Sequence, residues 1–220
     1  MSLNPLLLAF TGASGAPYGL RLMELLLQGG RAVDLILSNP ARVVLKQECG
    51  LELHGDGPAV VDTLLDYFNS SAMNSLNDQK RGKLRHFALD DWYSPAASGS
   101  GGERIMVICP CSMGSLARIR HGLSGNLIER AADVTIKEGG RLILVPRESP
   151  YSTIHLDNML ALSKLGVTLL PASPGFYYRP DSIQALIDFV VARILNQLGV
   201  VHDLTPGWPE KAQNHPALLP

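Results

Sequence analysis

Short apolar runs alternate with longer amphipathic segments along most of this chain, and this alternation limits the folds that it can adopt. Each run is apolar at nearly every position, which is typical of parallel strands covered on both faces. The runs predict strands at residues 6–11, 32–38, 105–109, 142–146 and 167–170. The segments between and after them predict helices at residues 17–28, 40–47, 125–138, 153–165 and 181–198. Such an order, with short connections, indicates a doubly wound α/β fold with one parallel sheet.

Two regions do not follow this alternation. Residues 69–103 are polar and irregular and end in a run of Ser and Gly, which indicates a long loop. Residues 203–220 carry four prolines and Trp208, so this segment cannot form a regular helix. We therefore expect a single domain over residues 1–202 and a proline-rich tail, residues 203–220, that packs over the active site or over a neighbouring subunit.

Composition excludes several classes of protein. The 19 basic and 20 acidic side chains give a net charge of −1, which argues against binding nucleic acid or a membrane surface by bulk electrostatics. No apolar run approaches the roughly 20 residues that a membrane span needs. Charged residues make up only 18%, so we expect part of the surface to be buried in a homo-oligomer. Three cysteines are too few for a disulfide framework and favour the cytoplasm.

A glycine-rich loop follows the first predicted strand and suggests a ligand site. It contains Gly12, Ala13, Ser14 and Gly15 and leads into a helix. Glycines permit a tight turn, and free N–H groups at a helix N-terminus attract anions, so we expect a phosphate group here; a plain βα turn is the alternative. The dinucleotide motif GxGxxG is absent, because Ser14 stands at its second glycine. The second strand ends at Ser38 rather than at an acidic residue, which favours FMN over NAD or FAD.

A second polar loop lies where a doubly wound sheet places its cofactor, beyond the carboxyl end of the strand at residues 105–109. The candidate cofactor residues of this loop are Ser112, Met113, Gly114 and Ser115. Cys109 and Cys111 precede them without the second pair of ligands that a zinc site needs. We interpret them as buried thiols and expect no metal.

Charged side chains near the later strands are candidates for catalysis. Arg147 and Glu148 follow the strand at residues 142–146, where a guanidinium can bind a phosphate and a carboxylate can transfer a proton. A structural ion pair is the alternative for these two residues. Arg130 and Lys137 lie two helical turns apart, and Arg193 lies in the last helix. From helical periodicity alone, Arg130, Lys137 and Arg193 are equally well explained as ordinary exposed surface residues.

Taken together, these segments resemble one family over residues 6 to about 208. Each motif alone is modest, but their order and combination are specific. The motifs are TGASGAPYGLRL, CPCSMGSLA, NLIERAADVTIKE, LVPRESP, IHLDNM and PGFYYRP. They are similar to those of the UbiX-type flavin prenyltransferases, which were long labelled aromatic acid or polyprenyl-hydroxybenzoate decarboxylases.

The resemblance implies a three-layer Rossmann/flavodoxin-like fold, a dodecameric assembly and a specific reaction. The family joins a dimethylallyl group from dimethylallyl monophosphate to N5 and C6 of reduced FMN. The product, prenylated FMN, is the cofactor of UbiD-type decarboxylases.

The same resemblance implies roles for single residues. FMN would be held by Gly12, Ala13, Ser14, Ser38, Ser112, Met113, Gly114, Ser115 and Arg147. The donor phosphate would be held by Ser98, Gly99, Arg130, Lys137, Tyr177 and Arg193, some of them from neighbouring subunits; whether Tyr177 or Tyr178 meets the phosphate stays open. Proton transfer would fall to Glu48 and Glu148, and the allyl pocket would be walled by Trp92 and Trp208. The implied catalytic residues are thus Glu48, Lys137, Glu148 and Trp208.

The chemistry of these residue types favours the same reaction. A monophosphate leaves readily only when its charge is met, and charge-assisted hydrogen bonds contribute roughly 1.5–3 kcal/mol each. Aromatic faces stabilise a developing allyl cation by about 2 kcal/mol when they are desolvated. The chain has one DDxxS segment, at residues 90–94, and no second copy. We therefore expect a transfer that needs no Mg²⁺.

Two other functions fit part of this pattern. An FMN-dependent decarboxylase of the phosphopantothenoylcysteine type would share the fold, but it needs a catalytic His after the first helix and a PxMNxxM-like segment. The corresponding stretches of this chain lack both, although His54 is loosely placed. A flavin carrier without chemistry of its own would have no use for the leaving-group residues.

Overall fold

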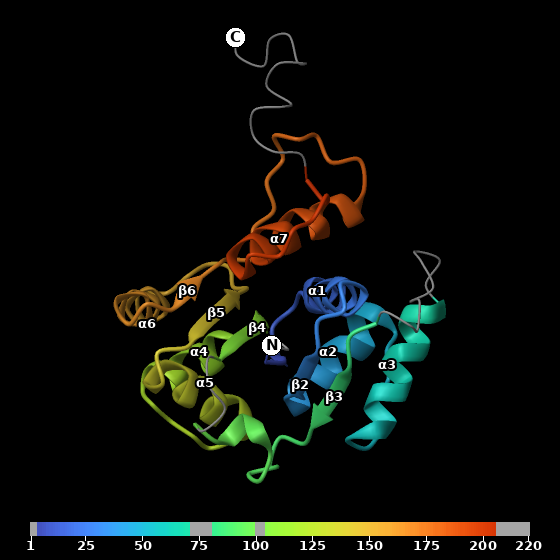
Figure 1. Ribbon diagram of the computed structural model, residues 1–220. Coiled ribbons are helices and arrows are strands. Elements are labelled where there is room, and N and C mark those ends of the chain that lie inside the picture. Colours follow the sequence, from blue (N-terminus) through green and yellow to red (C-terminus); the bar gives the residue numbers. More distant parts are fainter. Residues whose placement is uncertain (1–3, 71–80, 100–103, 206–220) are drawn as a thin grey trace, which may run out of the picture.

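Parallel strands form the central layer of the protein (Figure 1). The computed structural model describes residues 4–70, 81–99 and 104–205. Within them the sheet has six strands in the order β3-β2-β1-β4-β5-β6. These are β1 (Leu6–Phe10), β2 (Val33–Leu37), β3 (Leu84–Phe87), β4 (Ile105–Cys111), β5 (Arg141–Pro146) and β6 (Thr168–Leu169). The predicted doubly wound α/β fold is confirmed.

Helices cover both faces of this sheet. One face carries α1 (Ala16–Gln28), α2 (Asn39–Cys49), α3 (Pro58–Ser70) and α7 (Ile183–Leu198). The other face carries α4 (Met113–Arg120), α5 (Leu127–Lys137) and α6 (Thr153–Lys164). A short 3₁₀ turn, η1 (Pro95–Ala97), packs against α5. None of the helices in the described ranges has the length and apolar character needed to cross a membrane.

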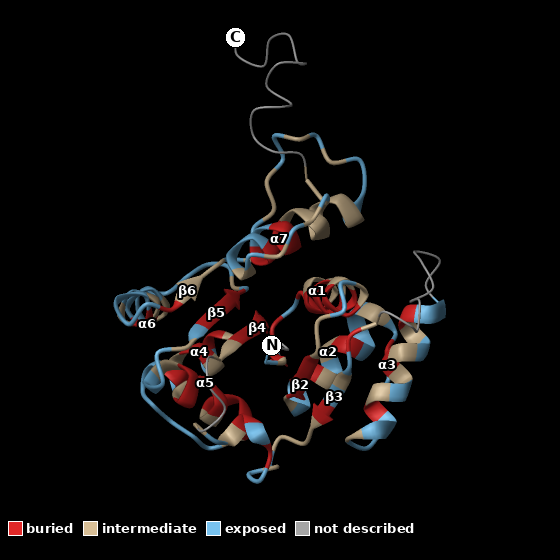
Figure 2. Cartoon of the chain, in the orientation of Figure 1, coloured by how far each residue is buried: buried red, intermediate tan, exposed pale blue. Residues whose placement is uncertain are grey.

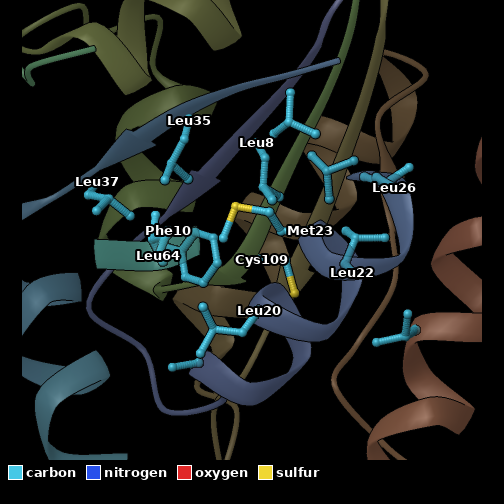
Figure 3. Close-up of a cluster of buried hydrophobic side chains, with 14 of the residues drawn as sticks. Leu8, Phe10, Leu20, Leu22, Met23, Leu26, Leu35, Leu37, Leu64 and Cys109 are labelled. Carbon is cyan, nitrogen blue, oxygen red and sulfur yellow. The ribbon is translucent and has the colours of Figure 1, made fainter. Parts of the chain in front are cut away.

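Each face of the sheet has its own core, because alternate residues of a strand point to opposite faces. In β1, Leu6, Leu8 and Phe10 pack with the α1 side, whereas Leu7 and Ala9 pack with the α5 side. All five are at most 5% exposed. Figure 2 shows the buried strands in red between the two helical layers, and Figure 3 shows the α1-side core. Burial on both faces explains why the strands are continuous apolar runs.

The direction in which the chain crosses the sheet reverses between β3 and β4. The strands β1, β2 and β3 proceed to one edge, and β4 then returns to pair with β1 on its other side. Helix α1 therefore leaves β1 over one face, while α4 leaves β4 over the other. Such a reversal opens a crevice at the carboxyl ends of the two strands, which is where doubly wound sheets bind ligands.

The structure corrects the expectation that residues 69–103 are irregular, because β3 lies within them. In this edge strand only His86 is fully buried. The guanidinium of Arg85 reaches to the carboxylate of Asp34 on β2, with two bonds of 2.7 Å. A strand that is half polar leaves no apolar run in the sequence, so the pattern did not reveal it.

Two helices were also missed. Helix α3 buries Val60, Leu64 and Phe68 at a four-residue spacing that the sequence does carry. Helix α4 was interpreted as loop, because β4 continues to Cys111, two residues beyond its predicted end. Residues 206–220 lie outside the described residues, so the packing of the proline-rich tail stays a prediction.

Gly19 of α1 marks a very close approach of that helix to the sheet. A Cβ atom added there would lie 2.5 Å from the ring of Phe10 and would also overlap the carbonyl oxygen of Cys109. We predict that Gly19→Ala lowers the free energy of unfolding by about 1–3 kcal/mol, because the helix must move away from the sheet. The control is Gly29→Ala just past the other end of α1, where an added Cβ stays 3.4 Å from the nearest atom. Chemical denaturation that finds the two variants equally stable would contradict this prediction.

Candidate functional site

The predicted cofactor residues gather at one edge of the sheet. Gly12–Ser14 follow β1, Ser38 follows β2, Ser112–Ser115 follow β4, and Arg147 follows β5. Because the strands are parallel, these segments meet at the carboxyl ends, around the reversal between β1 and β4. The structure therefore places all of them beside the crevice in which ligands bind in this fold. Which of their atoms hold a flavin stays a prediction.

A threonine joins the two loops at this crevice. The hydroxyl of Thr11 donates to the carbonyl oxygen of Pro110 at 2.9 Å and accepts from the N–H of Ser112 at 2.7 Å. Thr11 is 2% exposed, so these bonds are made away from water. Sequence reasoning treated Thr11 only as the end of a strand and missed this role. The signal was a polar residue at the end of an apolar run.

The N-terminus of α4 lies directly after β4, beside the reversal between β1 and β4. Ser112 caps this helix, with its hydroxyl oxygen accepting from the N–H of Ser115 at 3.2 Å. The N–H groups of Met113 and Gly114 precede the first intrahelical bond and have no partner within the helix. A Cβ added at Gly114 would meet no atom within 4 Å. An anion can therefore reach this helix end, which carries a partial positive charge.

The N-terminus of α1 differs from what we expected. The N–H groups of Gly15 and Ala16 both donate to Oε2 of Glu48, at 2.9 Å each. Gly15 has a φ of 116°, in the left-handed region that favours glycine, which fixes the turn before the helix. The expected phosphate position at these two N–H groups is thus filled by a carboxylate of the chain itself. The same contacts hold Glu48 next to the loop that contains Ser14.

Side chains after β2 and β5 border the same edge. The Ser38 hydroxyl oxygen accepts from the N–H of Ala41 at 3.1 Å, which leaves its hydrogen to be donated elsewhere. Arg147 is exposed, and the half-buried Glu148 accepts from the N–H of Ser149 at 3.1 Å. Within the described part of the chain, Arg147 and Glu148 form no ion pair with each other. A structural ion pair therefore does not account for this Arg-Glu sequence.

Four of the predicted donor-phosphate residues lie together beside α5. They are Ser98, Gly99, Arg130 and Lys137. A Cβ added at Gly99 would lie 3.1 Å from Nζ of Lys137 and would overlap the carboxylate of Glu138, so a larger residue would require these side chains to move. Lys137 donates to Glu138, and Nε of Arg130 donates to the carbonyl oxygen of Ala97 at 3.2 Å. Arg130 also pairs with Asp133 at 3.3 Å, so the end of α5 and the segment after η1 form one cluster in which each cation has a carboxylate partner.

The other two predicted donor-phosphate residues, Tyr177 and Arg193, line a groove along α7. The groove has a volume of about 660 Å³ and is also lined by Tyr178 and Phe189. The ring centroids of Tyr177 and Tyr178 are 4.2 Å apart. A hydrogen bond with Tyr177 raises the pKa of Tyr178, so this phenol keeps its proton. The structure places both tyrosines beside Arg193.

These two groups belong to opposite faces of the sheet. Helix α5 packs against the face that carries Leu7 and Ala9, whereas α7 packs against the face that carries Leu8. In Figure 1, α7 lies at the top of the view and α5 at the lower left, with the sheet between them. A single chain therefore does not bring all six residues to one ligand.

Of the two tryptophans predicted to wall the allyl pocket, Trp92 and Trp208, only Trp92 lies in the described residues. Trp92 is 46% exposed and lines a cavity of about 640 Å³ at the carboxyl ends of β2 and β3. Arg42, Asp90 and Asn126 line the same cavity. Trp208 lies outside the described residues, so its position stays a prediction.

Buried groups near the crevice are structural. Cys109 and Cys111 are fully buried, as predicted. Burial raises the pKa of Cys111 to about 12 and the pKa of Cys109 further, so both remain thiols. In residues 4–70, 81–99 and 104–205, no group of His, Cys, Asp and Glu side chains has an arrangement that could hold a metal ion.

The start of α5 is fixed by a carboxylate that sequence reasoning did not single out. Glu129 is 3% exposed and accepts from the N–H of Gly125 at 2.8 Å and from Nδ2 of Asn126 at 2.7 Å. Asn126 in turn accepts from the N–H of Glu129 at 3.0 Å. The signal was present, because a capping residue followed three positions later by Glu is typical of a helix start.

His86 of β3 is buried and held neutral by its surroundings. Its Nδ1 accepts from the N–H of Gly57 at 3.0 Å, so that nitrogen carries no proton. Burial and, to a smaller extent, the neighbouring Arg42 together lower the pKa of His86 to about 4, while Asp56 opposes the shift. The folded protein therefore binds this proton only in acid.

We predict that this histidine makes stability depend on pH between 6.5 and 4. The unfolded chain protonates His86 near 6.5 but the folded chain only near 4, so the free energy of unfolding falls on acidification by on the order of 3 kcal/mol. The variant His86→Asn keeps an acceptor for Gly57 and removes this part of the slope, measured by denaturation across the pH range. The control, the exposed His54→Asn, keeps the wild-type slope; an unchanged slope in His86→Asn would refute the assignment.

Comparison with known proteins supports the resemblance seen in the motifs. A family described as Flavoprotein matches residues 2–195. A curated relative from Pseudomonas aeruginosa, named flavin prenyltransferase UbiX, is 49% identical over 204 residues, which cover 93% of each chain.

Solved structures agree with that comparison. A dodecameric FMN-dependent UbiX-like decarboxylase from Escherichia coli O157:H7 is 35% identical, with a TM-score of 0.76, and the match covers 93% of this chain and 98% of the other. AnUbiX (PadA1), solved with FMN and dimethylallyl pyrophosphate, is 34% identical, with a TM-score of 0.75 and the same coverage. Family, identity and fold therefore agree over nearly the whole chain. The protein belongs to the UbiX family of flavin prenyltransferases.

Proposed function

We propose that this protein transfers a dimethylallyl group from dimethylallyl monophosphate to N5 and C6 of reduced FMN and so makes prenylated FMN. The observation that carries the proposal is the gathering of the motif residues at the reversal between β1 and β4, in a member of the UbiX family. The related AnUbiX was solved with FMN and with the diphosphate form of the donor. In the reaction the carbon–oxygen bond of the donor breaks and phosphate leaves with the electron pair, while a carbon–nitrogen bond forms at N5, which loses its proton. The double bond of the allyl group then takes up a proton, the resulting carbocation forms a bond to C6, and the proton on C6 is lost.

The residues at the crevice fit a flavin mononucleotide. The N–H groups of Met113 and Gly114 and the hydroxyl of Ser115 can donate to its terminal phosphate, at a helix end that favours negative charge. Ser38 has a hydroxyl hydrogen to donate, and the exposed guanidinium of Arg147 can bind a phosphate or the flavin edge. Reduced FMN supplies the nucleophilic N5 and C6 when it is bound.

Two carboxylates are placed to move protons. Glu48 is held by the N–H groups of Gly15 and Ala16, beside the loop that carries Ser14. Glu148 follows β5 at the same edge and has no ion-pair partner in Arg147. We assign to Glu148 the delivery of a proton to the departing phosphate and the later acceptance of the proton from C6.

We propose that the donor phosphate is bound between subunits. Ser98, Gly99, Arg130 and Lys137 would come from one chain, and Tyr177 and Arg193 from another, because α5 and α7 cover opposite faces of the sheet. Their hydrogen bonds strengthen as charge develops on the leaving phosphate, which lowers the barrier. The dodecameric Escherichia coli relative supports an assembly of this kind.

The setting of the reaction is also a proposal. The product would pass to a UbiD-type decarboxylase, and the tail at residues 203–220 would bring Trp208 over the allyl group. The free cysteines Cys49, Cys109 and Cys111 support a cytoplasmic location.

Anaerobic mass spectrometry of the flavin tests the proposal. The protein is mixed with FMN, dithionite and dimethylallyl monophosphate, and we expect the flavin to gain one C5H8 group, with the same yield in EDTA. A parallel reaction uses the diphosphate donor. Prenylation with this donor alone would show that the enzyme is active but prefers the diphosphate. FMN that stays bound and unmodified with both donors would contradict the proposal and favour a flavin carrier or a decarboxylase.

A further inference from the structure

Two arginines hold the four successive carbonyl groups of residues 95–98. Arg104 donates to the carbonyl oxygens of Pro95, Ala96 and Ser98, at 3.0, 2.7 and 2.5 Å. Nε of Arg130 donates to the carbonyl oxygen between them, that of Ala97, at 3.2 Å. A short turn whose carbonyl groups are all bound by guanidinium groups has little freedom to shift.

Arg104 is itself fixed to the sheet. It directly precedes β4, and its carbonyl oxygen accepts from the N–H of Arg141, the first residue of β5, at 2.8 Å. The side chain of Arg104 therefore ties the turn to the rigid core rather than to another loop. At the far end of the turn, Gly99 lies against Lys137, where an added Cβ would be 3.1 Å from Nζ.

Among the described residues, the guanidinium of Arg104 forms hydrogen bonds to carbonyl oxygens rather than an ion pair with a carboxylate. In the described part of the chain its hydrogen bonds go to neutral carbonyl oxygens, and the nearby Asp34 is bound by both arms of Arg85. Burial lowers the pKa of Arg104, which shows that holding this cation here costs free energy. A lysine could not make the same contacts, because its ammonium group lacks the planar fork of donors.

We propose that Arg104 is a positioning residue for the donor-phosphate site: it sets Ser98 and Gly99 against Lys137 so that backbone and ammonium groups meet one phosphate. This inference rests on the proposed function, because it takes residues 98–99 and Lys137 to bind the donor. Arg104 acts through the turn and touches no substrate. Its loss should therefore weaken donor binding and leave FMN binding unchanged.

Steady-state kinetics of Arg104→Lys test this inference. We expect KM for dimethylallyl monophosphate to rise about tenfold or more, kcat to stay within about threefold, and FMN affinity and subunit number to match the wild type. The matched control is Arg85→Lys, the same substitution near the same edge of the sheet, which should leave KM unchanged. If Arg104→Lys does not fold, Arg104→Gln takes its place, with the same expected rise in KM.

Hydrogen exchange at residues 94–99 of the substrate-free protein distinguishes failure of this inference from failure of the proposed function. Faster exchange in Arg104→Lys together with a raised KM supports the inference. An unchanged KM in an active, folded variant overturns it, whatever the exchange rate. A wild-type protein that prenylates no flavin overturns the proposed function and this role with it, and exchange then reports only whether Arg104 orders the turn.

Discussion

The site depends on one hydroxyl group at the point where the sheet reverses. Thr11 binds the carbonyl oxygen of Pro110 and the N–H of Ser112, and so joins the loops after β1 and β4. Since α1 and α4 leave these loops over opposite faces, the crevice between them needs such a tie to keep its shape. The N-terminus of α4 lies beside this reversal, while the N-terminus of α1 is filled by Glu48. The start of α1 therefore anchors a carboxylate of the chain, whereas the start of α4 keeps N–H groups that an anion could bind.

The two-faced fold has a second consequence, which concerns the prenyl donor. A sheet covered on both sides separates the α5 cluster from the α7 groove within one chain. The α5 cluster contains Arg130 and Lys137, and the α7 groove contains Arg193, so neither place alone has the full predicted set. Assembly would supply what one chain cannot, and it agrees with the low fraction of charged residues, 18%. In this account the oligomer is part of the active site.

The sequence predicted the fold well where burial leaves a pattern. The strands buried on both faces were found, as was α7, whose buried stripe includes Val190, Val191 and Ile194. The edge strand β3 was missed because Arg85 and His86 interrupt its apolar run. Among site residues, those of the loops were found by their position after strands. The roles of Thr11 and Arg104 could not be predicted, because each acts on residues that only the folded chain brings near it.

Mixed oligomers test the central claim, that the donor site is completed between subunits. Lys137→Ala and Arg193→Ala are made separately, each with little activity, and are then co-expressed so that they assemble together. If the two residues come from different chains, random mixing restores intact sites, and we expect about a quarter of wild-type prenylated FMN formation. If one chain supplied both residues, no mixed oligomer would contain an intact site. Activity no higher than that of the separate variants would contradict the account.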